Sequence, residues 1–218
     1  QAQPTPITID YPEEGSIFPP EITPPAFLWR DASKTATRWR IQIAFGDGAA
    51  PIQAESKGER LKIGPIDERT VAATNELPKL SPQQAEAWAW TPDAETWRTI
   101  KARSVERPAT VRITGLTGAD SGRAVSSGVV TIRTSKDPVG APIFFRDVPL
   151  MPSEVQKGVI KPLDASAVPL IVWRLRNVGE PNSRLLMEGL HSCANCHSFS
   201  RDGKTLGMDL DGPQNDKG

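Results

Sequence analysis

The chain lacks net charge and lacks long apolar runs. Its 26 Lys and Arg residues balance 26 Asp and Glu residues over 218 positions. Nucleic-acid binders and polybasic membrane-surface domains depend on clustered positive charge, so the balance argues against both classes. The longest apolar run, Val168 to Trp173, is far shorter than the roughly 18 residues of a membrane-spanning helix. We therefore expect neither nucleic acid as a partner nor a transmembrane segment.

Residues that commonly carry catalysis are also scarce. The chain has two Cys, two His and one Tyr, and it contains neither a hydrolase signature nor a glycine loop that would cradle phosphate. The scarcity of these signatures predicts that the protein is not an enzyme by itself and leaves open its membership of a larger oxidoreductase complex.

The first residues lack the basic and apolar regions of a signal peptide.

Proline, by contrast, is abundant. The chain has 21 Pro residues, about twice the average usage of roughly 5%, and seven of them lie within residues 1–25. Proline breaks helix interiors and central strands. A mainly helical fold is therefore not expected, and residues 1–25 are expected to form either an extended arm that lies on a partner or a solvated tail.

Alternating apolar residues predict β-strands over the first 140 residues. The clearest is 37–45, where Trp39, Ile41, Ile43 and Phe45 share one face, as in a half-buried strand. Further strands are expected at residues 7–11, 26–29, 60–63, 109–114 and 128–134.

A short helix is expected to interrupt these strands. Ser81-Pro82 and Thr91-Pro92 each place an N-cap residue before proline at the first helical position, which is typical of a helix start. From Pro92 to Arg103, acidic residues come early and basic residues late, an order that suits the helix dipole.

These segments resemble a fibronectin type III or immunoglobulin-like module. Residues 27–29 resemble its buried-Trp strand, 39–43 the strand that follows, and 128–134 its closing strand. The expected fold is thus mainly β: an antiparallel sandwich over 1–140 with a short inserted helix. Residues 141–218 are expected to form a Pro-rich extended segment, with candidate strands at 143–148 and 168–175, that ends in a haem c attachment segment and a terminal hairpin.

The two cysteines and one of the histidines fall within five residues. The sequence Cys193-Ala194-Asn195-Cys196-His197 is C-x-x-C-H, and chance produces it on the order of once in 10,000 shuffles of this composition, so it is a specific sign of haem attachment. Two other interpretations use the same residues. The cysteines could form a disulfide or redox pair, or they could bind zinc together with His197 and His191.

The motif resembles that of mono-haem c-type cytochromes. The resemblance implies one covalent haem c, with thioether bonds from Cys193 and Cys196 and with His197 as the proximal iron ligand. Leu190 and Phe199 would help to exclude water from the ring. Because haem c is attached outside the cytoplasm, the resemblance also implies a periplasmic or secreted protein, of bacterial origin.

The distal iron ligand is predicted less directly. Met208 lies downstream of the motif, where c-type cytochromes usually place an axial Met, and it is the expected distal ligand. However, Asp202-Gly203 predicts a hairpin tip, and counting outward places His197 opposite Met208, on the same sheet face. Met187, Met151, a partner chain, water and an open site are the alternatives.

Two further patterns lie in the last twenty residues. Residues 199–206 resemble the blade motif of TolB-like β-propellers, as at the junction between haem segment and propeller in some bacterial secreted cytochromes. An oxygen-rich cluster is a candidate calcium site or a solvated acidic turn; its residues are Asp209, Asp211, Asn215 and Asp216.

The expected function is one-electron transfer outside the cytoplasm with a redox partner protein. One alternative is a haem-bearing docking or structural subunit of a larger electron-transfer assembly. Another is a haem sensor or enzyme whose sixth iron position is open.

Overall fold

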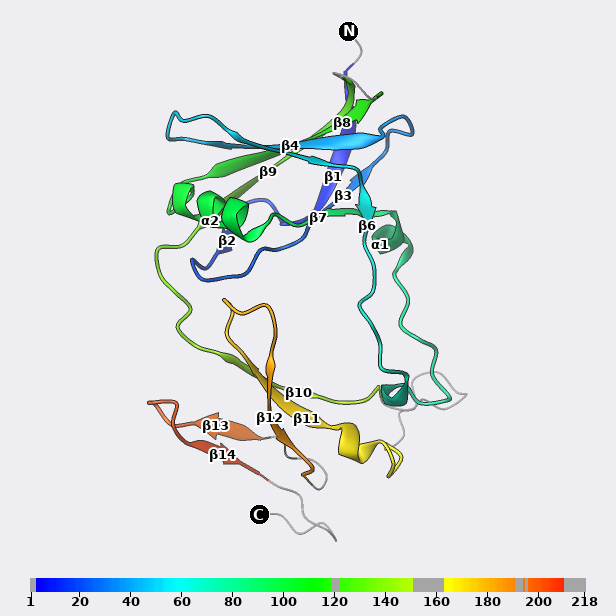
Figure 1. Cartoon of the computed structure of the whole chain (residues 1–218), viewed down its shortest axis with the longest axis vertical. Coiled ribbons are helices and arrows are strands. Elements are labelled where there is room, and N and C mark those ends of the chain that lie inside the picture. The colour runs from blue at the N-terminus through cyan, green and yellow to red at the C-terminus, as the bar shows by residue number, and fades with distance from the viewer. Residues whose placement is uncertain (1–2, 119–121, 151–162, 191–193, 195, 210–218) are drawn as a thin grey trace. The chain divides into compact units, whose positions relative to one another are not determined.

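The computed structural model describes residues 3–118, 122–150, 163–190, 194 and 196–209 (Figure 1). The chain forms two compact units, one of residues 1–63 and 79–140 and one of residues 64–78 and 141–218. The sequence had placed residues 64–78 in the sandwich. They lie instead in the second unit, where Val71 forms a parallel β-bridge with Leu150 and the Thr70 carbonyl accepts a hydrogen bond from the Leu150 amide.

The first unit is an antiparallel β-sandwich, as the sequence predicted. One sheet has the order β1-β3-β7-β6 and the other has the order β5-β4-β8-β9; β1 also pairs with β9, in parallel, as does β2. These strand orders are compatible with the ABED and C′CFG sheets of an immunoglobulin-like sandwich. The strands are β1 (Thr5–Tyr11), β2 (Ser16–Phe18), β3 (Phe27–Asp31), β4 (Arg38–Phe45), β5 (Ile52–Ser56), β6 (Glu59–Arg60), β7 (Trp88–Trp90), β8 (Ala109–Thr117) and β9 (Arg123–Thr134).

The core lies between the two sheets and follows from the alternation in the sequence. Trp39, Ile41 and Ile43 of β4 are buried, while the residues between them are only partly covered. Trp29 of β3 packs edge-on against Trp39 of β4, with ring centroids 5.9 Å apart. Large aromatic side chains from both sheets therefore account for much of the apolar area that stabilises this unit.

Two helices lie between β6 and β8: α1 (Pro82–Glu86) and α2 (Ala94–Arg103). Ser81 caps α1 with a reciprocal capping box, as the Ser-Pro pair predicted. For α2 the predicted cap was wrong: Asp93, not Thr91, accepts the Thr96 amide at 2.8 Å and the Thr96 hydroxyl at 3.0 Å. The Asp93 carboxylate accepts two hydrogen bonds near the positive end of the helix dipole. It is therefore a more favourable N-cap than Thr91, which the Thr-Pro pair had indicated.

Trp97 and Ile100 of α2 share the buried face of that helix. The Trp97 indole also donates a hydrogen bond to the Ile22 carbonyl oxygen over 2.9 Å. This bond ties part of the Pro-rich arm to the core, so at Ile22 the arm is integrated into the sandwich.

The second unit contains a three-stranded antiparallel sheet, β10-β11-β12, and a hairpin, β13-β14. The candidate strands at 143–148 and 168–175 contain β10 and most of β11, and these two strands pair with each other, so residues 141–218 are not simply an extended segment. The elements are β10 (Ile143–Asp147), β11 (Val172–Arg176), β12 (Arg184–Glu188), β13 (His197–Phe199) and β14 (Leu206–Met208), with short 3-10 turns η1 (Glu68–Thr70) and η2 (Val168–Leu170). No helix within the described part of the chain is long and apolar enough to cross a membrane.

Candidate functional site

The C-x-x-C-H motif leads into the hairpin of the second unit. Cys196 is an exposed free thiol, and His197 is the exposed first residue of β13. Ala194, between the two cysteines, is fully buried. Cys193 and Asn195 lie outside the described residues.

The motif backbone is held at two points. The buried Trp173 of β11 donates a hydrogen bond from its indole nitrogen to the Ala194 carbonyl oxygen over 3.1 Å. The Asp209 amide, just after β14, donates to the Cys196 carbonyl oxygen over 2.8 Å. Because a buried carbonyl that loses its partner costs about 1–3 kcal/mol, these bonds fix the path of the chain on both sides of Asn195.

The face of the three-stranded sheet that meets the motif follows from its register. Phe144 is directly opposite Leu175, and Arg146 is directly opposite Trp173. Opposed residues, and residues two apart on one strand, share a face. This face therefore carries Phe144, Arg146, Trp173 and Leu175. It is turned toward the motif, because the Trp173 indole donates its hydrogen bond to the Ala194 carbonyl oxygen.

Aromatic rings pack directly against His197. The Phe144 ring lies 4.7 Å from the His197 ring, and the Phe199 ring lies 5.5 Å from that of Phe144, all in edge-to-face arrangements. Phe199 remains 45% exposed. The imidazole is thus oriented by apolar contacts and borders an aromatic surface that solvent reaches.

A small apolar cluster supports this surface from beneath. Its buried members are Ile171, Trp173 and Ala194. The partly buried side chains around them are Phe144, Leu163, Val168, Met187, Leu190 and Met208. Leu190, expected from the sequence to line the site, is among them.

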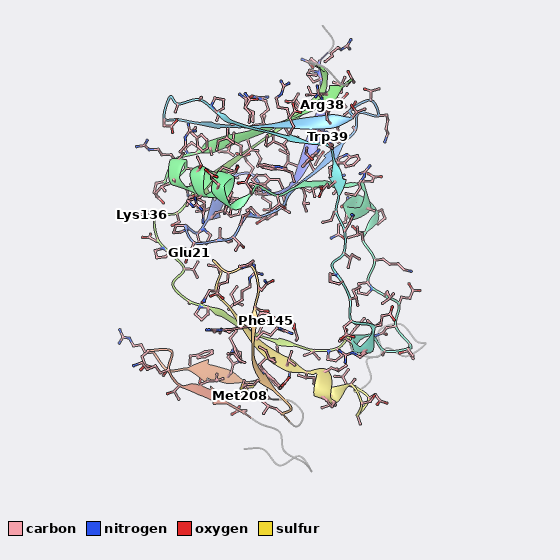
Figure 2. The ribbon with its side chains drawn as sticks, viewed as in Figure 1. Glu21, Arg38, Trp39, Lys136, Phe145 and Met208 are labelled. Atoms are coloured by element: carbon pink, nitrogen blue, oxygen red, sulfur yellow. The ribbon has the colours of Figure 1, made fainter. Side chains whose placement is uncertain are left out.

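The hairpin has the register that Asp202-Gly203 predicted. His197 pairs with Met208, Ser198 with Gly207 and Phe199 with Leu206; Figure 2 labels Met208 on β14. The loop is wider than a two-residue turn, since the Ser200 amide donates to the Thr205 carbonyl over 2.9 Å.

Polar groups close this loop. The Ser200 hydroxyl donates to the Asp202 carboxylate over 2.6 Å, and the Lys204 amide donates to the same oxygen over 3.2 Å. The hydroxyl first, and then the amide, lower the pKa of Asp202 below its ordinary value. Gly203 has φ +69°, a left-handed conformation that glycine adopts without strain.

This register counts against Met208 as the distal ligand of an iron held by His197. Two directly opposed side chains lie on one side of a hairpin, with Cβ atoms roughly 5 Å apart. Axial ligands must approach the iron from opposite faces of a flat macrocycle. While β13 and β14 stay paired, Met208 therefore borders the His197 side of the site.

Several predicted residues fall outside the described part of the chain. These are His191, Met151 and, of the candidate calcium ligands, Asp211, Asn215 and Asp216. The remaining calcium candidate, Asp209, is described and exposed. Among the described residues, no group of three or more His, Cys, Asp or Glu side chains is arranged to hold a metal ion.

The described donor set fits a covalently attached haem. A thioether needs an accessible thiol, which Cys196 supplies, and a proximal ligand needs an accessible imidazole, which His197 supplies. The macrocycle needs apolar side chains beside these two donors. Phe144 and Phe199 stand there, and Phe199 is in part exposed.

Trp173 and Phe144 were not singled out from the sequence as site residues. Trp173 lies in the apolar stretch 168–175 and alternates with Leu175, which is the only local signal that it is buried. Nothing local indicates that its indole would meet Ala194, because 21 positions separate the two residues.

A scan against protein-family models finds no match for this chain, and a search of curated proteins finds none either.

Proposed function

We propose that this protein is a c-type cytochrome that carries one covalent haem. The observation that carries the proposal is the C-x-x-C-H motif on an anchored backbone: Ala194 is buried and hydrogen-bonded, while Cys196 and His197 are exposed. A motif used only for packing would bury its reactive side chains. Here the backbone is fixed and the thiol and imidazole face outward.

Each residue of the site would have a distinct role. Cys193 and Cys196 would tether the ring through thioethers, and His197 would ligate the iron. Phe144 holds the imidazole plane through its edge contact at 4.7 Å. Phe199 and the partly buried Met208 and Leu190 would exclude water from the ring. The haem, once bound, supplies the one-electron couple.

The proposal implies a location outside the cytoplasm and a redox protein as partner. Covalent haem attachment implies maturation outside the cytoplasm, and hence a periplasmic or secreted bacterial protein. Its partner would be a redox protein that docks near the exposed haem edge. In this role the chain is an electron carrier and performs no further chemistry on a substrate.

The intact mass of the denatured protein tests the proposal. The protein should be purified from its native host, or from a host that attaches haem c. We expect the polypeptide mass plus one haem, and the haem should be lost in the Cys193→Ser, Cys196→Ser double variant. A wild-type mass equal to the bare polypeptide, or lower by the two hydrogens of a disulfide, would refute the cytochrome proposal and leave a β-sandwich with a thiol pair.

A second candidate is a haem-bearing subunit of a larger assembly. The sheet face turned away from the motif carries the exposed apolar side chains Ile143 and Leu185. Phe145, two residues after Ile143 on β10 and labelled in Figure 2, is separated from Leu185 by Arg174, with which both pair. Exposed apolar patches of this kind often mark protein contacts. Co-purification from the native host as a stable complex, lost in Ile143→Ser with Leu185→Ser, would favour the subunit. A monomer of unchanged size in both proteins would favour the lone carrier.

A further inference from the structure

The outer face of the β5-β4-β8-β9 sheet of the sandwich carries a row of arginines. Side chains of a strand alternate between the two faces of a sheet. The buried side chains of β4, β8 and β9 point into the core, so the side chains between them point away from it. Three of these outward side chains are Arg40, Arg112 and Arg133, one on each strand, and we call this surface the arginine face.

The strand register spaces the three cations across the sheet. Arg40 pairs with Thr114, two residues after Arg112 on β8, so the two arginines are diagonal neighbours roughly 7–8 Å apart. Arg112 pairs with Val129, and Arg133 lies four residues further along β9, about 13 Å at 3.3 Å per residue. The charges therefore form an extended row over three adjacent strands.

The arginine face has few carboxylates to balance these charges. Within the described part of the chain, the register places one on the face: Glu55 of β5, opposite Arg40, whose carboxylate lies 3.6 Å from Nη1 of Arg38. At the edge of the face, the Glu14 carboxylate accepts the Thr131 amide over 2.8 Å. The guanidinium groups of the three arginines in the row make no ion pair with any described residue. This face is thus locally positive in a chain whose total charge is zero.

The side chains around the arginines are polar. The exposed large apolar side chains of the face are Val129 and, on the neighbouring β2, Ile17. Protein interfaces have apolar cores rich in aromatic residues, and proteins that bind single-stranded nucleic acid stack the bases on aromatic rings. The outward positions of β4, β8 and β9 carry no aromatic ring among the described residues; they carry amides and hydroxyls, namely Gln42, Thr110, Thr114, Ser127 and Thr131. Such a face suits a hydrophilic polyanion.

We propose that the arginine face binds an acidic polysaccharide through its uronate carboxylates or sulfate esters. The planar guanidinium donates two parallel N–H bonds to a carboxylate, and it binds other oxyanions in the same way. The amide and hydroxyl side chains between the arginines would bind the hydroxyl groups of the sugars. This binding is a property of the sandwich and goes beyond the proposed electron transfer, because it would hold the protein in an acidic extracellular matrix.

Binding of the full chain to three polymers tests the proposal. Polygalacturonate offers carboxylates, dextran sulfate offers sulfate esters, and unmodified dextran is the uncharged control. Oligothymidylate and polyglutamate of the same charge represent nucleic acid and an acidic protein. Each affinity is measured at several salt concentrations, because a bound polyanion releases counterions and its affinity falls as salt rises.

Two triple variants separate the face from net charge. Arg40→Gln, Arg112→Gln, Arg133→Gln removes the row. The matched control removes the same charge from exposed arginines outside these strands; it is Arg98→Gln, Arg107→Gln, Arg201→Gln. Glu55→Gln removes the carboxylate of the face instead, and it provides a gain of binding that a misfolded variant could not give.

We expect the wild type to bind polygalacturonate, dextran sulfate or both, and the tighter of the two identifies the preferred anion. The row variant should bind roughly tenfold more weakly, since each exposed charge pair contributes modestly and three are lost. The control variant should stay within about twofold of wild type, and Glu55→Gln should bind more tightly. Melting temperatures should be equal, because the changed side chains lie outside the core.

Several outcomes would overturn the assignment. Equal losses in the two triple variants would reduce the interaction to net charge, and unchanged or weaker binding by Glu55→Gln would place it elsewhere. Failure to bind either acidic polysaccharide, or equal binding of unmodified dextran, would also refute it. Tighter binding of oligothymidylate or polyglutamate would assign the face to nucleic acid or to an acidic protein. The intact-mass test of haem attachment is independent of all these results.

Discussion

His197 and Met208 face each other across the β13–β14 hairpin as a directly paired couple. The Asp209 amide, next to Met208, also binds the Cys196 carbonyl, next to His197, over 2.8 Å. These bonds tie Met208 to the strand that carries His197. Met187 lies outside this hairpin, on β12, opposite Trp173.

The first prediction concerns the sixth iron ligand. We expect Met208→Leu, a change that nearly conserves volume, to leave the visible and near-infrared spectra of both oxidation states unchanged. Met187→Leu is the matched variant outside the hairpin, and it should lose any methionine–iron signature that the wild type has. A signature lost in Met208→Leu instead would mean that the hairpin opens when haem binds. Carbon monoxide binding by the reduced wild type would reveal an open or labile sixth site.

The second prediction concerns the bond between Trp173 and Ala194. Trp173→Phe leaves the buried Ala194 carbonyl without its donor, so we expect the second unit to lose about 1–3 kcal/mol of stability, beyond the cost of the smaller ring. Trp29→Phe is the control, because Trp29 is equally buried but its indole nitrogen has no partner within the described residues. Amide hydrogen exchange measures the free energy of opening of each unit separately. Equal losses in the two variants would show that ring volume alone matters.

The third prediction concerns Gly58, which precedes β6. Its φ is +81°, and an added Cβ would meet the Trp39 ring and would stand 2.9 Å from the Trp88 ring. Gly48 has a similar φ, +74°, with open space around it. We expect Gly48→Ala to cost about 1–2 kcal/mol for the left-handed backbone, and Gly58→Ala to cost a further ~1–3 kcal/mol for overpacking. Urea denaturation followed by tryptophan fluorescence measures both, and equal costs would rule out the ring contact.

The fourth prediction concerns the ion pair between Asp47 and Arg103. Hydrogen bonds from the Arg103 side chain first, and then from the Ala49 amide, lower the pKa of Asp47 from 3.8 to about 2. A lowered carboxyl pKa stabilises the folded state above the unfolded-state pKa, and this contribution is lost as pH falls through the folded value. Asp47→Asn should therefore lower the melting temperature at pH 7, and the difference from wild type should shrink between about pH 4 and pH 2. A difference that stays constant down to pH 2 would mean that the charge is not its source.

Local patterns in the sequence predicted most of the sandwich. The alternation of Trp39, Ile41 and Ile43 indicates a strand with one buried face, because successive side chains of a strand point to opposite sides. Ser81-Pro82 indicates the start of α1 for an equally local reason, since the cap and the helix are neighbours in sequence. The predicted strand at 60–63 was largely wrong, because β6 is Glu59–Arg60 and shares only Arg60 with it. The candidate strand 168–175 begins as a 3-10 turn at its proline before β11.

The mainly β class, the position of the C-x-x-C-H motif and the pairing of His197 with Met208 follow from local sequence patterns, because each depends on residues within a few positions of one another. Three other features appear only in the folded chain: residues 64–78 join the second unit, Trp173 binds Ala194, and Arg146 shares a sheet face with Phe144. Each of these depends on pairing between segments far apart in the chain. Such pairing is chosen by the packing of the whole unit, and no local pattern encodes the partner.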